Sequence, residues 1–365
     1  IMAECFRIPS RPQRLAVALA IALAAGGCMV GPDYARPDLD LPAGSSGVQK
    51  LADDWWRAFG DPVLDGFEAE ALAHLTRYDS THGRFQGRVD LQDGQLNING
   101  HQIPLFNEPC PEKLPWTALN VDLVLECTGQ FRARDQAALH LHAGAKKVVI
   151  GAAPFDEVDA TVVFGVNHQT VKPEHRIISS VSCTTHALVP LVKILDDAFG
   201  VESGMLTEIH AVTSDQVVLD RTHRDLRRAR AAGVNIIPTS TSSIAALRRV
   251  LPDLGERIEG YSLRVPTHNV AALDFSFVSQ KPVTAQAVNQ IFKQKSQNGF
   301  QSILGFCDEL LVSSDFNHSP YSLIFDATET RVVGRQVKVL AWYDNEWGYA
   351  NRLLDLCSYL SHCFR

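Results

Sequence analysis

The chain has 365 residues, of which 45% are hydrophobic and 21% are charged, so it can form two or three domains with sizeable cores. Its net charge of −7 leaves no overall basic surface, and we expect no nucleic-acid partner. The eight cysteines lack the paired spacing of metal ligands, which argues against a zinc module and predicts no metal site. No apolar run reaches the ~18–20 residues that a membrane-spanning helix needs.

The first residues combine the three parts of a secretory signal. Arg7, Arg11 and Arg14 precede the apolar run 15–25, and two glycines then lead to Cys28. A cysteine after small residues is where bacterial lipoproteins are cleaved and lipidated. The alternative is a short buried helix of alanine and leucine, and the residues themselves leave both interpretations open.

The segment that follows resembles the start of an outer-membrane efflux lipoprotein. The similarity rests on MVGPDYARPDLDLP at 29–42 and DDWWRAFGDPVLDGFEAEAL at 53–72. It implies that residues 1–72 are a foreign leader, although the sequence after them lacks the long helices and barrel strands of an efflux duct. We expect a membrane partner, and an outer-membrane location through Cys28, only if this leader is genuine.

From about residue 75 the pattern becomes that of an α/β protein. Residues 90–106 alternate around Asp93-Gly94 and Asn99-Gly100, which predicts three strands joined by two turns. The apolar run 121–129, a helical stretch and a second apolar run then form a βαβ unit and indicate a parallel sheet. A strand around ATVVFGVN and a helix over 184–199 continue this alternation.

Beyond Val201 long strands dominate. They are predicted in GMLTEIHAV, in YSLRVPTHNVAALDFSFV and in RQVKVLAWYD, with helices near 285–295 and 347–361. We therefore predict the α/β class: a truncated Rossmann-type parallel-sheet domain and an α+β catalytic domain with a mostly antiparallel sheet. The expected divisions are a leader over 1–72, an incomplete dinucleotide-binding domain over 73–182, a catalytic domain over 183–340, and a returning C-terminal helix over 341–365.

One cysteine and one histidine carry the clearest chemistry. Cys183 lies among hydroxyl residues just before an amphipathic helix, where N–H groups and the helix dipole stabilise a thiolate. His210 lies at the end of an apolar strand that can deliver it to the start of that helix, where it would activate the cysteine. Taken alone, each residue is more often a buried structural side chain, and only their combination favours catalysis.

Five motifs together resemble the glyceraldehyde-3-phosphate dehydrogenase superfamily. They are SVSCTTHALVP, IHAVTSDQVVLD, DLRRARAAGVNIIPTSTSS, LRVPTHNVAALDFSF and WYDNEWGYANRLLD, and the resemblance extends over residues 75–360. The segments LPWTALNVDLVLECTG, KPEHRIIS and LVSSDFNHSPYS more closely resemble the sister enzyme, erythrose-4-phosphate dehydrogenase, whereas LRRARAA and NIIPTST resemble the glyceraldehyde enzyme. Either aldose phosphate is therefore an expected substrate, with a preference for erythrose 4-phosphate. The resemblance implies NAD as cofactor and a cytoplasmic homotetramer, with the basic loop RTHRDLRRARAAGVNIIP near a subunit interface.

The same resemblance implies a role for each matching residue. Cys183 would be the nucleophile that forms a hemithioacetal and then a thioester with a phosphorylated aldehyde, and His210 would be its base. Inorganic phosphate or water would release the acyl group. The substrate phosphate would contact Thr213, Asp215, Arg228 and Arg264; the second anion site would contain Ser182, Thr184, Thr241 and Ser242; and NAD would contact Thr128, Gly129, Asn345, Glu346 and Tyr349.

The chain also departs from the family pattern. It contains no G-x-G-x-x-G, the turn that holds the pyrophosphate of a dinucleotide, and the leader occupies the place of that first βαβ unit. Val181, His186, Ser242 and Gly151 replace the alanine, asparagine, glycine and hydroxyl residue that are usual in the family. The alternatives to a dehydrogenase are therefore an inactive truncated fusion or a lipid-anchored envelope protein.

Overall fold

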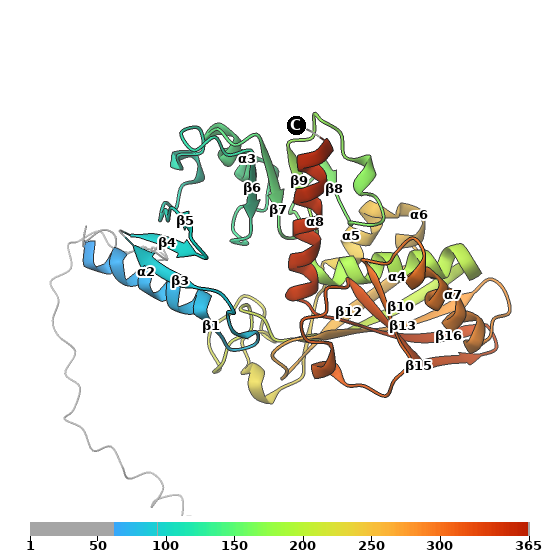
Figure 1. The fold of residues 1–365 in the computed structure, drawn as a ribbon. Coiled ribbons are helices and arrows are strands. Elements are labelled where there is room, and N and C mark those ends of the chain that lie inside the picture. Colours follow the sequence, from blue (N-terminus) through green and yellow to red (C-terminus); the bar gives the residue numbers. More distant parts are fainter. Residues whose placement is uncertain (1–61, 93, 364–365) are drawn as a thin grey trace, which may run out of the picture. The chain divides into compact units, whose positions relative to one another are not determined.

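The computed structural model describes residues 62–92 and 94–363 (Figure 1). For Pro62–Glu68 it describes the backbone alone. These residues all belong to one compact unit of the chain. The expectations for Cys28, for the apolar run 15–25 and for the rest of the leader up to residue 61 fall outside the described residues. None of the helices that the structure describes is long and apolar enough to cross a membrane.

The first described element is helix α2, Pro62–Arg77, which is continuous across the expected boundary at residue 72. Its Ala73 is buried against Val89 and Leu96, so the end of the expected leader is packed with the strands that follow. The helix leads through two short strands into an antiparallel sheet with the two predicted turns. Their bounds are β1 Tyr78–Asp79, β2 Gly83–Arg84, β3 Val89–Gln92, β4 Gln95–Ile98 and β5 His101–Ile103.

The predicted βαβ unit belongs to a four-stranded, fully parallel sheet with the order β6-β7-β9-β8. Its elements are β6 Leu123–Glu126, helix α3 Arg134–His142, β7 Lys147–Ile150, β8 Ala160–Thr161 and β9 Ile177–Ser179. The strand predicted around ATVVFGVN is much shorter than expected. The Asn167 side chain accepts from the N–H of Val163 and donates to the carbonyl of Thr161, which turns the chain away after two residues.

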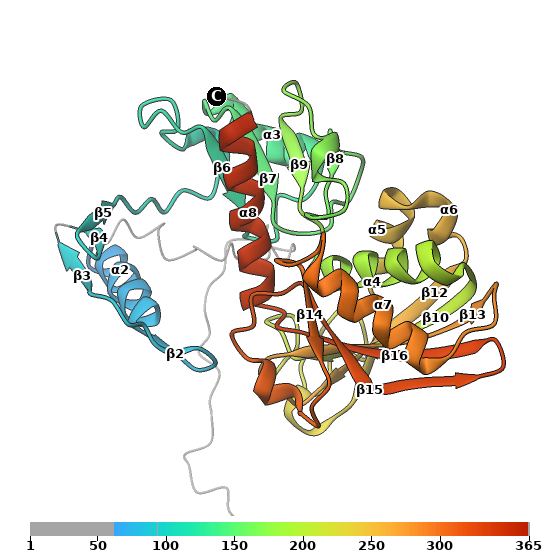
Figure 2. The ribbon, with the colours of Figure 1, turned by 45° about the vertical axis from the view of Figure 1, so that its right-hand side comes forward.

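The second sheet has seven strands in the order β11-β12-β10-β13-β16-β15-β14 and, as predicted, is mostly antiparallel (Figure 2). Only the β10–β12 and β14–β15 pairs are parallel. The strands are β10 Val201–Ala211, β11 Ile237–Thr239, β12 Ile258–Val265, β13 Ala271–Ser279, β14 Leu304–Cys307, β15 Leu323–Val333 and β16 Gln336–Tyr343. The associated helices are α4 Cys183–Phe199, α5 Ser243–Val250, α6 Pro252–Gly255 and α7 Ala285–Gln297.

The long strand expected over 261–278 is divided into β12 and β13. The chain turns between them at Val270, whose φ is +66°, and the two strands then pair with opposite sides of β10. The strand that carries Glu208 and His210 is thus held along both edges. The prediction of one uninterrupted strand was wrong at this turn.

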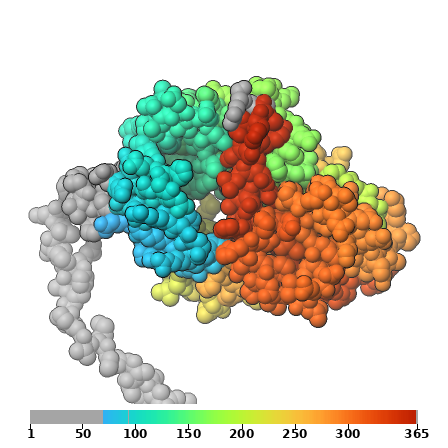
Figure 3. Space-filling model, in the orientation of Figure 1, coloured from blue at the N-terminus to red at the C-terminus, as the bar shows by residue number. Residues whose placement is uncertain are grey.

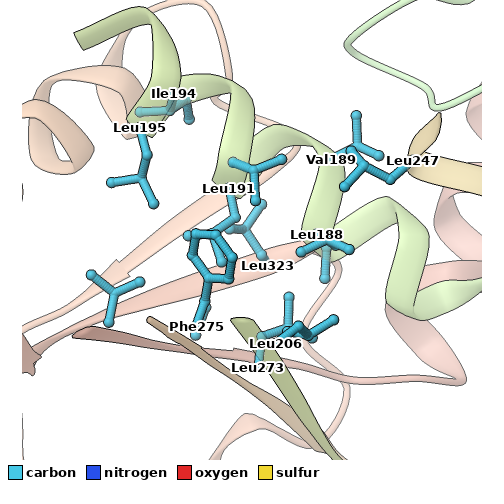
Figure 4. Close-up of a cluster of buried hydrophobic side chains, with 14 of the residues drawn as sticks. Leu188, Val189, Leu191, Ile194, Leu195, Leu206, Leu247, Leu273, Phe275 and Leu323 are labelled. Carbon is cyan, nitrogen blue, oxygen red and sulfur yellow. The ribbon is translucent and has the colours of Figure 1, made fainter. Parts of the chain in front are cut away.

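The largest apolar core lies between helix α4 and the seven-stranded sheet (Figure 4). Leu188 and Leu191 of α4 are fully buried in the same cluster as Leu273 and Phe275 of β13. Burying side chains of this size stabilises the fold by ~1.5–3 kcal/mol each. This packing fixes the start of α4, and with it Cys183, relative to the strand that carries His210.

The C-terminal helix α8, Trp347–Cys363, packs against the parallel sheet. Its Leu353, Leu356 and Leu360 lie in one buried cluster with Val149 of β7 and Ile178 of β9. The opposite side of the helix is on the surface, where it is drawn in red in Figure 3, and Leu354 is 64% exposed there. Residues 344–346, which connect β16 to α8, are therefore held at both ends.

Candidate active site

Cys183 is the first residue of α4, directly after a tight turn from strand β9. Val181 in that turn has a φ of +46°, a left-handed conformation that is strained for a β-branched residue and costs ~1–3 kcal/mol. Hydrogen bonds hold it there: its N–H donates to Ser179 Oγ, and its carbonyl accepts from the hydroxyl of Tyr349 at 3.2 Å. Ser182 then caps the helix by accepting from the N–H of Thr185.

The structure brings Cys183 and His210 together. The Cys183 Sγ lies 3.5 Å from Nε2 of His210, which projects from strand β10. The cysteine is half-buried and the histidine is only 2% exposed. A thiol beside an imidazole at a helix N-terminus is an arrangement suited to nucleophilic catalysis.

A buried carboxylate that the sequence analysis did not include lies behind this pair. Thr184 Oγ1 donates to Glu208 Oε1 at 2.8 Å and accepts from the Tyr343 hydroxyl at 2.8 Å. Glu208 Oε1 is also 3.8 Å from His210 Nε2, while its Oε2 has no hydrogen-bond partner among the described residues. The signal was present in the sequence, because residues two apart on a strand share a face.

The charges of Glu208 and Arg264 shift the pKa values of Cys183 and His210 in opposite directions. Burial, together with the Glu208 charge, raises the pKa of the Cys183 thiol to about 11, against the hydrogen bonds of Thr184 and the charge of Arg264, which lower it. Burial lowers the pKa of His210 to about 4, and so does Arg264, while Glu208 raises it. Both shifts favour the neutral forms, a thiol and an imidazole, and so oppose the thiolate that the start of the helix favours.

The residues expected at the substrate phosphate lie in two groups. Arg264 reaches Nδ1 of His210 at 2.6 Å. Arg228 NH1 donates to the exposed Asp215 at 2.5 Å, and Thr213 Oγ1 donates to Gln216. Arg264 therefore lies beside the Cys183–His210 pair, whereas Arg228 is paired with the carboxylate of Asp215.

The hydroxyl groups expected at the second anion site differ in how far they are free to bind an anion. The Thr184 hydroxyl is buried in the Glu208 network, so it would have to leave a carboxylate in order to bind an anion. Ser182 Oγ contacts Thr185 Oγ1 at 2.7 Å, and Thr241 Oγ1 contacts Ser243 Oγ at 2.7 Å. Ser242 is exposed at the start of α5, and its side chain makes no capping hydrogen bond.

Part of the cofactor-binding set fits NAD. Asn345 is 8% exposed and its Oδ1 has no partner among the described residues, so it can accept from the carboxamide of a nicotinamide. Thr128 and Gly129 follow the end of β6, where ligands of parallel sheets bind, and both are exposed. Glu346 pairs with His82 at 2.8 Å, and Tyr349 supports the turn before Cys183. In the described part of the chain no G-x-G-x-x-G turn is present for the pyrophosphate.

Two departures from the family pattern have clear structural settings. His186 is buried, with Nδ1 3.2 Å from the carbonyl of Ser182 and Nε2 accepting from the N–H of Phe164. Burial lowers its pKa to about 4, so the neutral ring holds the first turn of α4 through these two contacts. A Cβ at Gly151 would lie 2.8 Å from Cys127 Sγ, so a hydroxyl side chain there requires the cysteine to move.

No group of three or more His, Cys, Asp or Glu side chains in residues 62–92 and 94–363 is arranged to hold a metal ion. The chemistry of the candidate site depends on the thiol, the imidazole and the charges around them.

Comparison with known proteins places this architecture in one family. Residues 63–134 match the glyceraldehyde 3-phosphate dehydrogenase NAD binding domain, and residues 182–345 match the C-terminal domain of the same enzymes. The plasmid-encoded glyceraldehyde-3-phosphate dehydrogenase of Cupriavidus necator is 48% identical over 300 residues, which are 82% of this chain and 89% of that enzyme. The chromosomal enzyme of the same organism is also 48% identical over 300 residues, with the same coverage.

The chain therefore belongs to the glyceraldehyde-3-phosphate dehydrogenase family of NAD-dependent oxidoreductases. This confirms the superfamily and the cofactor inferred from the motifs. The match to the NAD binding domain begins at residue 63, so it includes ten residues that we had assigned to the leader. The relatives are named for glyceraldehyde 3-phosphate, and the expected lean toward erythrose 4-phosphate is not shown by them.

Proposed function

We propose that this chain oxidises a phosphorylated aldehyde through a covalent acyl intermediate on Cys183. The observation that carries the proposal is the 3.5 Å contact between Cys183 Sγ and His210 Nε2 at the start of α4. Of the two substrates considered, we propose glyceraldehyde 3-phosphate, because the relatives that share 48% identity are named for it. Erythrose 4-phosphate is the competing substrate.

In the proposed reaction, the sulfur of Cys183 bonds to the aldehyde carbon while His210 Nε2 accepts the proton, giving a hemithioacetal. The backbone N–H of Cys183 at the helix start is placed to stabilise the resulting oxygen. Bound NAD would supply the hydride acceptor, held at its nicotinamide end by Asn345, Thr128 and Gly129. His210 returns its proton to that oxygen, which gives the hydroxyl of the hemithioacetal, and takes it back as the hydride leaves the carbon. The acyl group then stays on the sulfur as a thioester.

Inorganic phosphate or water would then attack the thioester carbon and release Cys183. We propose that Ser182 and Thr241 form the second anion site, because both are half-buried side chains with hydroxyl groups and Thr241 directly precedes the exposed Ser242. The added Ser242 side chain and the engaged Thr184 hydroxyl favour slower phosphorolysis than the family pattern implies. We place Arg264 at the substrate phosphate, with Arg228, Thr213 and Asp215 completing that site.

We also propose a cytoplasmic homotetramer. Between residues 213 and 236 lies a loop whose apolar side chains are exposed: Val218 85%, Leu219 77%, Leu226 84%, Val234 81% and Ile236 66%. An exposed apolar surface of this kind is typical of a subunit interface. The basic residues of the same loop would surround that contact.

The test of the reaction is NADH formation by the purified full chain at saturating NAD. We expect turnover with glyceraldehyde 3-phosphate to exceed turnover with erythrose 4-phosphate. The reverse ratio would assign the chain to the erythrose enzyme. No NADH with either substrate, from a folded chain, would favour the inactive fusion.

A further inference from the structure

Nδ1 of His210 faces two groups that make opposite demands on it. It lies 2.6 Å from NH1 of Arg264 and 2.7 Å from the carbonyl oxygen of Ala211. A guanidinium can only donate a hydrogen bond, and a carbonyl can only accept one. A neutral imidazole therefore satisfies one of these neighbours and leaves the other opposed.

The choice decides whether His210 can act as a base. If Nδ1 accepts from Arg264, the single proton of the ring is on Nε2, the atom 3.5 Å from Cys183 Sγ. Nε2 then has no lone pair with which to take the proton of the thiol. If Nδ1 donates to Ala211, Nε2 presents a lone pair to the thiol. Only the second tautomer can accept the proton that the proposed reaction releases.

The surroundings of Arg264 favour the first tautomer in the ligand-free protein. Its NH1 donates to His210 Nδ1 and, at 3.3 Å, to the Ala211 carbonyl, so it also competes for the acceptor that Nδ1 needs. The Nε atom of Arg264 is buried and has no partner among the described residues. The guanidinium is thus incompletely satisfied here, and an anion with several acceptor oxygens is a better partner for it.

We propose that binding of a phosphate group at Arg264 converts His210 from a tautomer that cannot act as a base into one that can. The phosphate draws the guanidinium away from Nδ1, a proton leaves Nε2 for solvent, and one from solvent enters Nδ1 and binds the Ala211 carbonyl. The net charge of the ring is unchanged. The inference rests on the proposed function only in taking the ligand to be a phosphate ester. The phosphate of the substrate would then both bind the substrate at Arg264 and set the tautomer of His210.

The experiment uses the full chain labelled with ¹⁵N-histidine, whose ring nitrogens report directly which one carries the proton. The His210 signals are those lost in His210→Asn. Glycerol 3-phosphate is the probe, because it carries the phosphate ester but no aldehyde, and glycerol is its control. We expect the proton on Nε2 in the free protein and with glycerol, and on Nδ1 when glycerol 3-phosphate is bound. A bound phosphate ester with no change of tautomer would overturn the switch.

Two variants separate this inference from the proposed function. Arg264→Leu, or Arg264→Met if the leucine variant does not fold, removes the guanidinium and leaves no side-chain donor at Nδ1, so it should give the Nδ1–H tautomer without any ligand. Arg228→Leu removes a guanidinium that does not touch His210, and the proton should stay on Nε2. An Nε2–H tautomer in the Arg264 variants shows that Arg264 does not set the proton's position and overturns the inference. Failure of glycerol 3-phosphate to bind wild type removes both the phosphate site and the switch, whatever the dehydrogenase activity.

Discussion

The hydroxyl of Thr184 donates to the carboxylate of Glu208 at 2.8 Å, with both side chains at most 3% exposed. This bond holds a negative charge close to the reactive thiol, since Thr184 is the neighbour of Cys183 in the first turn of α4. The carboxylate opposes a thiolate and favours a protonated imidazole. Burial and this carboxylate therefore both favour the thiol form of Cys183.

Replacing Glu208 should make Cys183 react at lower pH. In Glu208→Gln the acceptor for Thr184 is kept and the charge is lost, so the pKa of Cys183 falls from about 11. The pH profile of alkylation by iodoacetamide, with the site located by mass spectrometry, measures this directly. We expect a lower midpoint and several-fold faster alkylation near pH 8. Glu202→Gln, an exposed position on the same strand, is the control, and equal profiles for the two variants would contradict this role of Glu208.

His186 should make the protein sensitive to mild acid. Its pKa is lowered from 6.5 to about 4 in the folded protein, so the unfolded chain binds the extra proton between these values and stability falls as pH falls through that range. The full effect is on the order of 3 kcal/mol, and about 2 kcal/mol of it is lost between pH 7.5 and 5. Urea unfolding at the two pH values should show a smaller loss in His186→Asn than in wild type. The exposed control His101→Asn should lose as much as wild type, and an equal loss in all three proteins would refute the assignment.

The loop with exposed apolar side chains should hold subunits together. We expect light scattering to give a tetramer, and we expect Val218→Lys with Leu219→Lys to shift it to smaller species, because charges would be buried in the contact. Leu310→Lys places the same charge on another apolar side chain, which is 90% exposed, and should leave the tetramer intact. A folded monomer in the unmodified chain would disprove the assembly.

NAD should bind weakly to this chain. The proposed contacts at the nicotinamide end are Asn345, Thr128 and Gly129, and three hydrogen bonds at ~0.5–1.5 kcal/mol each would supply an affinity no better than the millimolar range. The larger contribution, a glycine-rich turn at a helix N-terminus, has no counterpart in the sequence. Isothermal titration should give a millimolar dissociation constant, weakened further in Asn345→Leu. Micromolar binding would show that other residues hold the pyrophosphate.

Local patterns in the sequence predicted most of the fold. Alternation around Asn99-Gly100 predicted the strands and turns of β3–β5, and the helix over 184–199 matches α4 within one residue. Two elements could not be predicted this way, because a side-chain hydrogen bond decides the length of one and long-range strand pairing decides the other. The Asn167 side chain ends β8 after two residues, and the pairing of β12 and β13 with opposite edges of β10 requires the turn at Val270.

The sequence was enough to predict which residues form the candidate site, but not their protonation or their hydrogen-bond partners. Motifs indicated Cys183 and His210, and the structure brings them to 3.5 Å. They did not indicate that burial and Glu208 keep the thiol protonated, or that Thr184 faces the interior. Those properties depend on which side chains a strand and a helix bury together, and only the packed structure shows that.

The most direct test of the account is a single turnover with enzyme in excess of glyceraldehyde 3-phosphate, at high NAD and without phosphate. The account predicts NADH equal to the substrate consumed and an acyl mass on Cys183, with both lost by several orders of magnitude in Cys183→Ala because the nucleophile is obligatory. NADH formation that survives in Cys183→Ala, or turnover with the acyl mass on another residue, would contradict it.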